Sequence, residues 1–233
     1  MQIRNRLFPI VVILGLLIVA GGCDKKGGGD SDNPAAVESK GHPVWGEYDL
    51  SSKLKILQGK SIMKLNAQSL VKIEGMRKLM EDMIFEVKGS EVTITAEKGE
   101  TVKGAIKVKS PCEVEFTVGG QPKAQFQLVQ SGKDAWFGLG GAGTKLGSGY
   151  IVCVQFGFVT YDGKKCTYHK SKVGRQTEFK TQEVKCSLEG EQFKFQIPKF
   201  MKEGEFEDKT LKVVGEVLLS EQMETDHKVR PAP

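Results

Sequence analysis

From residue 83 to residue 219 the chain is divided into short segments in which apolar and polar residues alternate. Phe85 and Val87, for example, alternate with Glu86 and Lys88. A side-chain period of two is typical of strands that bury one face. The segments expected to be strands are 85–88, 92–95, 102–109, 112–118, 124–128, 135–137, 166–169, 179–188, 193–197 and 211–219.

Turn signals separate these segments at short intervals. Gly89-Ser90, Gly119-Gly120, Ser131-Gly132-Lys133 and Asp162-Gly163 each stand between two alternating runs. Turns of this composition connect neighbouring antiparallel strands. The sequence therefore predicts a mainly β fold, an antiparallel barrel or sandwich with a meander of hairpins.

Two stretches depart from this pattern. Between Gln68 and Met83, apolar residues recur at intervals of three and four, which predicts one short amphipathic helix. Residues 150–159 are apolar with little alternation, which predicts a central strand covered on both faces.

The N-terminus has the order of parts that an export signal requires. Arg4 and Arg6 precede an apolar run from Leu7 to Ala20, and small residues then lead to Cys23. The run is shorter than the roughly 20 apolar residues of a spanning helix. An uncleaved anchor helix is the alternative interpretation.

The segment Ala20-Gly21-Gly22-Cys23 resembles the lipobox of bacterial lipoproteins, although Ala20 stands where that family usually has Leu. The resemblance implies that residues 1–22 are a signal peptide removed before Cys23. It also implies a diacylglycerol on the Cys23 sulfur and an acylated new amine, so membrane lipid would be the first partner. The expected location is the bacterial cell envelope, with the protein facing the periplasm or the cell surface.

Composition divides the rest of the chain. Residues 23–44 hold the acylated cysteine and a polar, Gly-rich stretch that predicts a flexible linker. Residues 45–220 are expected to form the β-rich domain, as one unit or two. Residues 221–233 are expected to be a disordered tail.

Four cysteines remain besides Cys23, and an even count in an exported chain favours two disulfides. Three pairings are possible. Cys166 and Cys186 lie symmetrically about position 176, inside a polar stretch, so they are placed to face each other across a hairpin. This favours Cys166–Cys186 and leaves Cys112–Cys153 as the second bond.

Charge argues against a nucleic-acid partner. The whole chain has 34 basic and 29 acidic residues. Without the two arginines of the signal, the net charge is 32 − 29 = +3. A nucleic-acid-binding surface calls for a concentrated basic face, which this balance does not indicate.

Leu57-Gln58-Gly59-Lys60, followed by the predicted helix and the hairpins, resembles the small lipocalin-like domains of bacterial lipoproteins. The resemblance covers about residues 54–137. That family usually has Trp two places after the glycine, where this chain has Ser61. The resemblance implies a meander barrel that holds an apolar ligand.

Three other motifs have the residue types of a nucleotide, metal or catalytic site. Residues 138–143 have the glycine spacing of a dinucleotide loop, but a strand pattern follows in place of a helix. Cys153, Cys166, His169 and Cys186 form a possible zinc set, without a Cys-x-x-Cys pair. The Ser-x-x-Lys at Ser69 lacks its companion motifs. We therefore expect no catalytic residue, no metal and no cofactor, and we expect that the protein is not an enzyme.

The function predicted from the sequence is a lipid-anchored binding module for a small apolar or amphiphilic ligand or for an envelope partner. The candidate ligand residues are Trp136 and Phe137, beside a loop at 138–149. The alternative is a structural or assembly lipoprotein that docks another envelope protein without a ligand.

Overall fold

The computed structural model describes residues 41–63, 83–95, 101–118, 124–154, 156–172, 175–199, 202 and 204–232. The signal sequence, Cys23, most of the predicted linker and the Gly119-Gly120 turn lie outside these ranges. So does the predicted helix at 68–83, except for Met83, which begins a strand.

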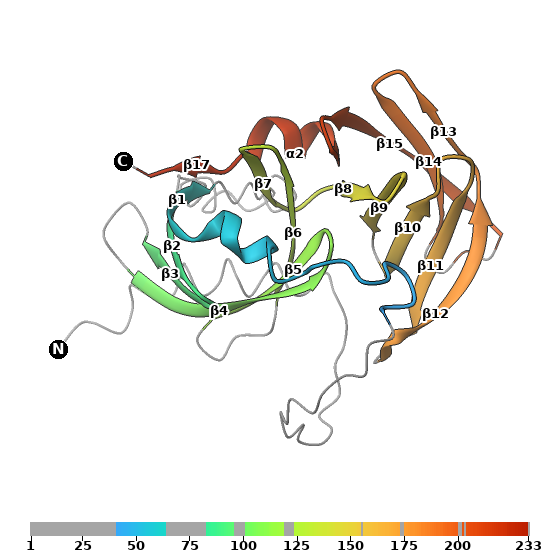
Figure 1. Cartoon of the computed structure of the whole chain (residues 1–233). Helices are drawn as coiled ribbons and strands as arrows, with labels where there is room; N and C mark the ends of the chain where they lie inside the picture. The colour runs from blue at the N-terminus through green and yellow to red at the C-terminus, as the bar shows by residue number, and fades with distance from the viewer. Residues whose placement is uncertain are drawn as a thin grey trace.

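The described chain is mainly β and antiparallel, as the alternation predicted, and it forms two curved sheets (Figure 1). The first sheet has the order β17-β1-β2-β3-β4-β5-β6-β7, so that all strands but the last in the chain form a meander. Its strands are β1 Gly59–Met63, β2 Met83–Lys88, β3 Glu91–Thr95, β4 Thr101–Ser110, β5 Glu113–Val118, β6 Ala124–Ser131, β7 Asp134–Gly138 and β17 Arg230–Pro231.

The second sheet follows the first in the chain and has the order β12-β11-β10-β9-β8-β16-β15-β14-β13. Its strands are β8 Ala142–Leu146, β9 Gly149–Val154, β10 Gly157–Tyr161, β11 Cys166–Lys172, β12 Arg175–Val184, β13 Cys186–Glu189, β14 Gln192–Pro198, β15 Phe206–Val214 and β16 Val217–Leu219. The two described helices are short: η1 Lys53–Leu57 and α2 Glu221–Asp226.

Three clusters of buried side chains form the core. One lies inside the first sheet and includes Phe85, Phe116 and Phe137. A second lies inside the second sheet and includes Phe193 and Phe195. The third lies between the two sheets. Cys112, Val129 and Trp136 contribute from the first sheet, and Trp45, Ala142, Ile151, Cys153, Phe158, Val217 and Leu219 are among its other members.

Three predicted turns are confirmed. The chain turns at 89–90 between β2 and β3, at 132–133 between β6 and β7, and at 162–165 between β10 and β11. At the last of these, the Asp162 carboxylate accepts the backbone N–H groups of Lys164 and Lys165, at 2.8 and 2.9 Å. This local hydrogen bonding explains why Asp-Gly is a dependable turn signal.

The prediction of one central strand over 150–159 is wrong. The segment is a tight hairpin in which β9 ends at Val154 and Gly157 opens β10 and pairs back onto it. Both strands bury both faces, one against the core between the sheets and one against the core of the second sheet. Alternation is therefore missing, and the turn residue Phe156 gives no turn signal.

The prediction of a loop over 138–149 is also wrong, because β8 lies within it, Gly138 ends β7 and Gly149 begins β9. The glycines serve close packing of strands. A Cβ at Gly143 would stand 2.7 Å from the Ile151 carbonyl oxygen on β9. Residues 139–141 form the connection from β7 to β8.

The disordered tail predicted for 221–233 is the third correction. Ser220 caps α2 by accepting the Met223 N–H, and the Met223 side chain is fully buried. Residues 227–232, which we name the C-terminal strap, then bridge the two edges of the first sheet. The Phe137 N–H on β7 donates to the His227 carbonyl at 2.9 Å, and the Ala232 N–H donates to the Lys60 carbonyl on β1 at 3.3 Å.

The disulfides are Cys112–Cys153 and Cys166–Cys186, the pairing that the turn positions favoured. Their Cα–Cα distances are 5.9 and 6.0 Å. The first joins the two sheets, since Cys112 precedes β5 and Cys153 lies on β9.

The second disulfide ties a corner of the second sheet. β12 and β13 lie at opposite edges of the sheet order, yet only Lys185 separates them in the chain. The Gln196 N–H on β14 donates to the Lys185 carbonyl at 3.0 Å. The chain thus turns at Lys185 and brings the two edges together, and Cys166–Cys186 crosses the same corner.

Candidate functional site

The two residues predicted to contact a ligand lie in two different cores. Phe137 is 1% exposed inside the first sheet, where its ring stacks on Phe126 with centroids 5.1 Å apart. Trp136 points the other way, into the core between the sheets, and is 3% exposed. Neighbouring residues on a strand face opposite sides, so the two cannot line one pocket. The buried Trp136 Nε1 has no hydrogen-bond partner among the described residues.

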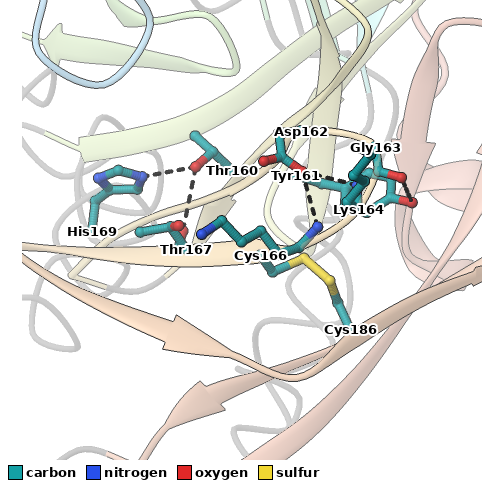
Figure 2. The surroundings of a disulfide bond; sticks show 10 residues. Thr160, Tyr161, Asp162, Gly163, Lys164, Cys166, Thr167, His169 and Cys186 are labelled. Atoms are coloured by element: carbon teal, nitrogen blue, oxygen red, sulfur yellow. Dashed lines mark hydrogen bonds between the residues drawn. A yellow bond between two sulfur atoms is a disulfide. The ribbon is translucent and has the colours of Figure 1, made fainter.

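The possible zinc set is used differently. Cys153, Cys166 and Cys186 are all in disulfides, and no metal-ligating cluster of three or more residues occurs in the part of the chain that the structure describes. His169 Nε2 instead lies 2.8 Å from Thr160 Oγ1 on the neighbouring strand (Figure 2).

Thr160 Oγ1 and His169 Nε2 are as close as the hydroxyl and the base of a catalytic pair, and no sequence motif indicated this pair. Burial lowers the pKa of His169, so the imidazole is neutral at pH 7. The His169 ring also meets the Phe179 ring edge-on, with the ring centroids 6.5 Å apart. A triad also needs a third group that orients the imidazole, and neither of these two contacts supplies a carboxylate.

An aromatic cluster attaches the start of the described chain to the second sheet. We name residues 41–48 the N-terminal clip. The His42 ring stacks on Trp45 at 3.2 Å, and Trp45 meets Phe158 edge-on at 5.2 Å. His42 also contacts Phe179 at 5.6 Å. The clip thereby covers β10 and β12 on the face toward the first sheet.

Lys53 is a buried cation, only 4% exposed. Its Nζ donates to the Leu128 carbonyl at 3.3 Å and lies 5.7 Å from the centre of the Tyr48 ring. Burial lowers the pKa of Lys53 to about 8. Burial also raises the pKa of Tyr48, against the opposing effect of a hydrogen bond to Thr144. The segment from the N-terminal clip to η1 thus reaches β6 of the first sheet and β8 of the second.

Glu113 is a carboxyl group with a raised pKa of about 7, mainly because it is buried; Lys109 lowers the pKa and Glu115 raises it. Lys109 and Glu115 form a partly buried ion pair at 3.7 Å. The carboxyl lies beside the junction of the sheets, since Glu113 pairs with Gln127, whose Nε2 donates to the Cys153 carbonyl at 3.2 Å.

Glu113 is expected to make stability depend on pH. Between pH 4.5 and about 7 the folded state keeps a proton that the unfolded state has released, so stability falls as pH rises through this window. Glu113→Gln should remove this slope and raise the free energy of unfolding at pH 8 by about 1–3 kcal/mol. Urea unfolding at several pH values measures the free energy of unfolding and its slope with pH. Glu91→Gln, at an exposed position on β3, is the control, and an unchanged slope in Glu113→Gln would contradict the assignment.

Among the described residues, no helix has the length and apolar character needed to cross a bilayer. Comparisons of the chain with protein-family models, with curated proteins and with solved structures gave no significant match.

Proposed function

We propose that this protein is a lipid-anchored component of the bacterial envelope whose two-sheet body docks another envelope protein and catalyses no reaction. The anchor rests on the order of charges, apolar run and small residues that ends at Cys23. Two disulfides, one joining the sheets and one tying a corner, suit a compartment where thiols oxidise.

The packed interior of the first sheet is the observation that favours docking of a partner over binding of a ligand. In a lipocalin-like module the ligand occupies the inside of the sheet, as a pocket of roughly 300 Å³ or more. Here that space holds phenylalanine rings in mutual contact, with Phe126–Phe137 at 5.1 Å, Phe85–Phe137 at 6.0 Å and Phe116–Phe126 at 6.2 Å. Leu57 from η1 adds to the same cluster. Because side chains fill the inside of the first sheet, recognition of a partner by the outer surface is favoured.

A small amphiphilic ligand is the second candidate, and one observation favours it. The Trp136 Nε1 is a buried donor without an acceptor among the described residues, and an acceptor group on a ligand would satisfy it. Such a ligand would lie between the sheets, beside Lys228, whose Nζ is 5.8 Å from the centre of the Trp136 ring.

The anchor is tested by fatty-acid labelling in bacterial cells. The wild-type chain is expected to take up label, whereas Cys23→Ser should take up none and accumulate as a larger precursor. Equal labelling of the two chains would refute the acylation of Cys23.

Docking is tested by a photo-crosslinking residue at Leu188 on β13 or Ile84 on β2. These are large apolar side chains that are 40% and 36% exposed. A discrete adduct with one envelope protein is expected from at least one of them, and none from the exposed control position Ser148. Native mass spectrometry of the purified protein separates the alternatives, because a copurifying small molecule would favour the ligand. Absence of both adduct and ligand would overturn the docking function.

A further inference from the structure

Glu113 on β5 and Gln127 on β6 oppose each other at the junction between the two sheets. They are register partners, so their side chains lie on the same face of the first sheet, with Cβ atoms about 4.5–5.5 Å apart. That face points toward the second sheet, because Val129, two residues after Gln127, belongs to the core between the sheets. A carboxyl group and an amide group are therefore within reach of each other at this junction.

The Gln127 amide uses only one of its two ends. Its Nε2 donates to the Cys153 carbonyl on β9 at 3.2 Å, which links the first sheet to the second. Its Oε1 is buried, and no donor among the described residues reaches this atom. A buried acceptor that lacks a donor destabilises a fold, so a donor is expected beside Oε1.

Glu113 is such a donor only while it carries its proton. A carboxylate accepts hydrogen bonds, whereas a protonated carboxyl has one O–H to donate. Burial raises the pKa of Glu113 to about 7, so the folded protein keeps this proton at mildly acid pH. Among the described residues, none donates a hydrogen bond to the Glu113 carboxyl or forms an ion pair with it.

Two charged residues of the first sheet act on Glu113. Lys109 on β4 lowers the pKa of Glu113 and Glu115 on β5 raises it, and these two residues form an ion pair with each other at 3.7 Å. Gln127 faces Glu113 from β6, and Cys153 brings a neutral carbonyl from β9. Because Lys109 is engaged by Glu115, the Glu113 proton is the donor that fits Gln127 Oε1.

We propose that Glu113, Gln127 and the Cys153 carbonyl form a proton-dependent latch between the sheets, in which the protonated Glu113 carboxyl donates to Gln127 Oε1 and keeps Gln127 Nε2 on the Cys153 carbonyl. When the proton leaves, the Glu113 carboxylate and Gln127 Oε1 are both acceptors. The carboxylate then competes with the Cys153 carbonyl for Gln127 Nε2, and the amide turns away from the second sheet.

The latch is closed at acid pH and opens as pH rises. Because the folded-state pKa of Glu113 is raised from 4.5 to about 7, the proton is held below that value and lost above it. The disulfide Cys112–Cys153 holds the same point covalently, so opening loosens the junction without separating the sheets. The latch does not depend on the proposed anchor or on the proposed docking partner.

An NMR titration of the isotope-labelled full chain, from about pH 5 to about pH 9, tests the latch in the wild-type protein. The Glu113 carboxyl carbon and the Gln127 Nε2 are expected to shift with one shared midpoint, near pH 7. Exchange of the Gln127 side-chain amide protons, corrected for the intrinsic effect of pH, should become about ten-fold faster above the midpoint. A Gln127 signal that does not titrate, or that titrates apart from Glu113, would overturn the latch.

Gln127→Met separates the hydrogen bond from the effect of burial. Methionine has a similar length but offers the carboxyl no oxygen acceptor, so the protonated form of Glu113 loses its partner. The Glu113 midpoint should therefore fall by about one unit, whereas burial alone predicts a midpoint that stays or rises beside the less polar side chain. Gln125→Met, at an exposed position on the same face of β6 opposite Glu115, is the control and should leave the midpoint unchanged. An equal fall in both variants would refute the hydrogen bond.

Glu113→Gln tests the other half of the latch and leaves the acceptor in place. An amide N–H at this position donates to Gln127 Oε1 at every pH, because it does not titrate. The Gln127 signal should therefore lose its pH dependence, and its side-chain amide should keep slow exchange above pH 7. If Gln127 still titrates near pH 7 in this variant, another group controls the amide and Glu113 has no part in it.

Discussion

Deletion of residues 221–233 is expected to lower the free energy of unfolding by about 5 kcal/mol or more. The deletion removes the buried Met223 and His227 side chains, which are 0% and 2% exposed. It also removes backbone hydrogen bonds from the C-terminal strap to β7 and β1. The facing edges of β1 and β7 would then be open, and open strand edges pair with other chains. Urea unfolding followed by tryptophan fluorescence and light scattering would measure both effects.

Point variants in α2 distinguish the loss of its core contact from a general effect of shortening the chain. Met223→Ala should cost about 2–5 kcal/mol, because it leaves a cavity beneath α2. Thr225→Ala lies on the exposed side of the same helix and should change stability by no more than about 0.5 kcal/mol. A truncated chain that keeps the wild-type midpoint, with slow hydrogen exchange in β1 and β7, would contradict the role of the strap.

Replacement of Cys112 and Cys153 together by alanine is expected to cost about 4 kcal/mol. The disulfide closes a separation of 41 residues, so its loss frees more of the unfolded chain than loss of Cys166–Cys186, with 20. Both sulfurs are buried in the core between the sheets. Without this bond we expect the sheets to unfold in separate steps, which hydrogen exchange followed in each sheet would detect.

The matched control is the double alanine variant of Cys166 and Cys186, for which the same entropy argument gives about 3 kcal/mol. That bond lies within the second sheet, so unfolding of the first sheet should be unaffected. If the Cys112–Cys153 variant unfolds in one transition at the wild-type midpoint, the bond does not couple the sheets.

The fold could be predicted from the sequence wherever one face of a strand is buried and the next turn has its own signal. Both conditions hold for β2 and β3, which Gly89-Ser90 separates, and these strands lie where alternation placed them. The pairing of Cys166 with Cys186 was predicted correctly from a hairpin centred near position 175. In that hairpin, however, Cys166 lies opposite Val184, and Cys186 reaches it from β13, beyond the corner at Lys185.

The prediction failed where the determining contact is distant in sequence. Met223 is the only apolar residue of α2, and nothing near it indicates that it enters the core beside Trp136 and Cys153. A Cβ on Gly138 would overlap the ring of His227, so this glycine serves close packing between β7 and the strap. Local pattern carries no information about contacts across some 85 residues.

The candidate sites also divide into features that the local sequence reveals and features that depend on contacts distant in sequence. Trp136 and Phe137 were recognisable as a large aromatic pair, but their opposite directions follow from the position of a second sheet that no local pattern reveals. The raised pKa of Glu113 and the lowered pKa of Lys53 arise from burial by segments far along the chain.

The position of the C-terminal strap has a consequence for biogenesis. The ribosome releases the strands of the first sheet early, yet the residues that bridge β1 and β7 are made only after the whole second sheet. Until the C-terminal strap emerges, the facing edges of β1 and β7 have no partner in the strap. Completion of the first sheet to be synthesised therefore waits for the synthesis of the second.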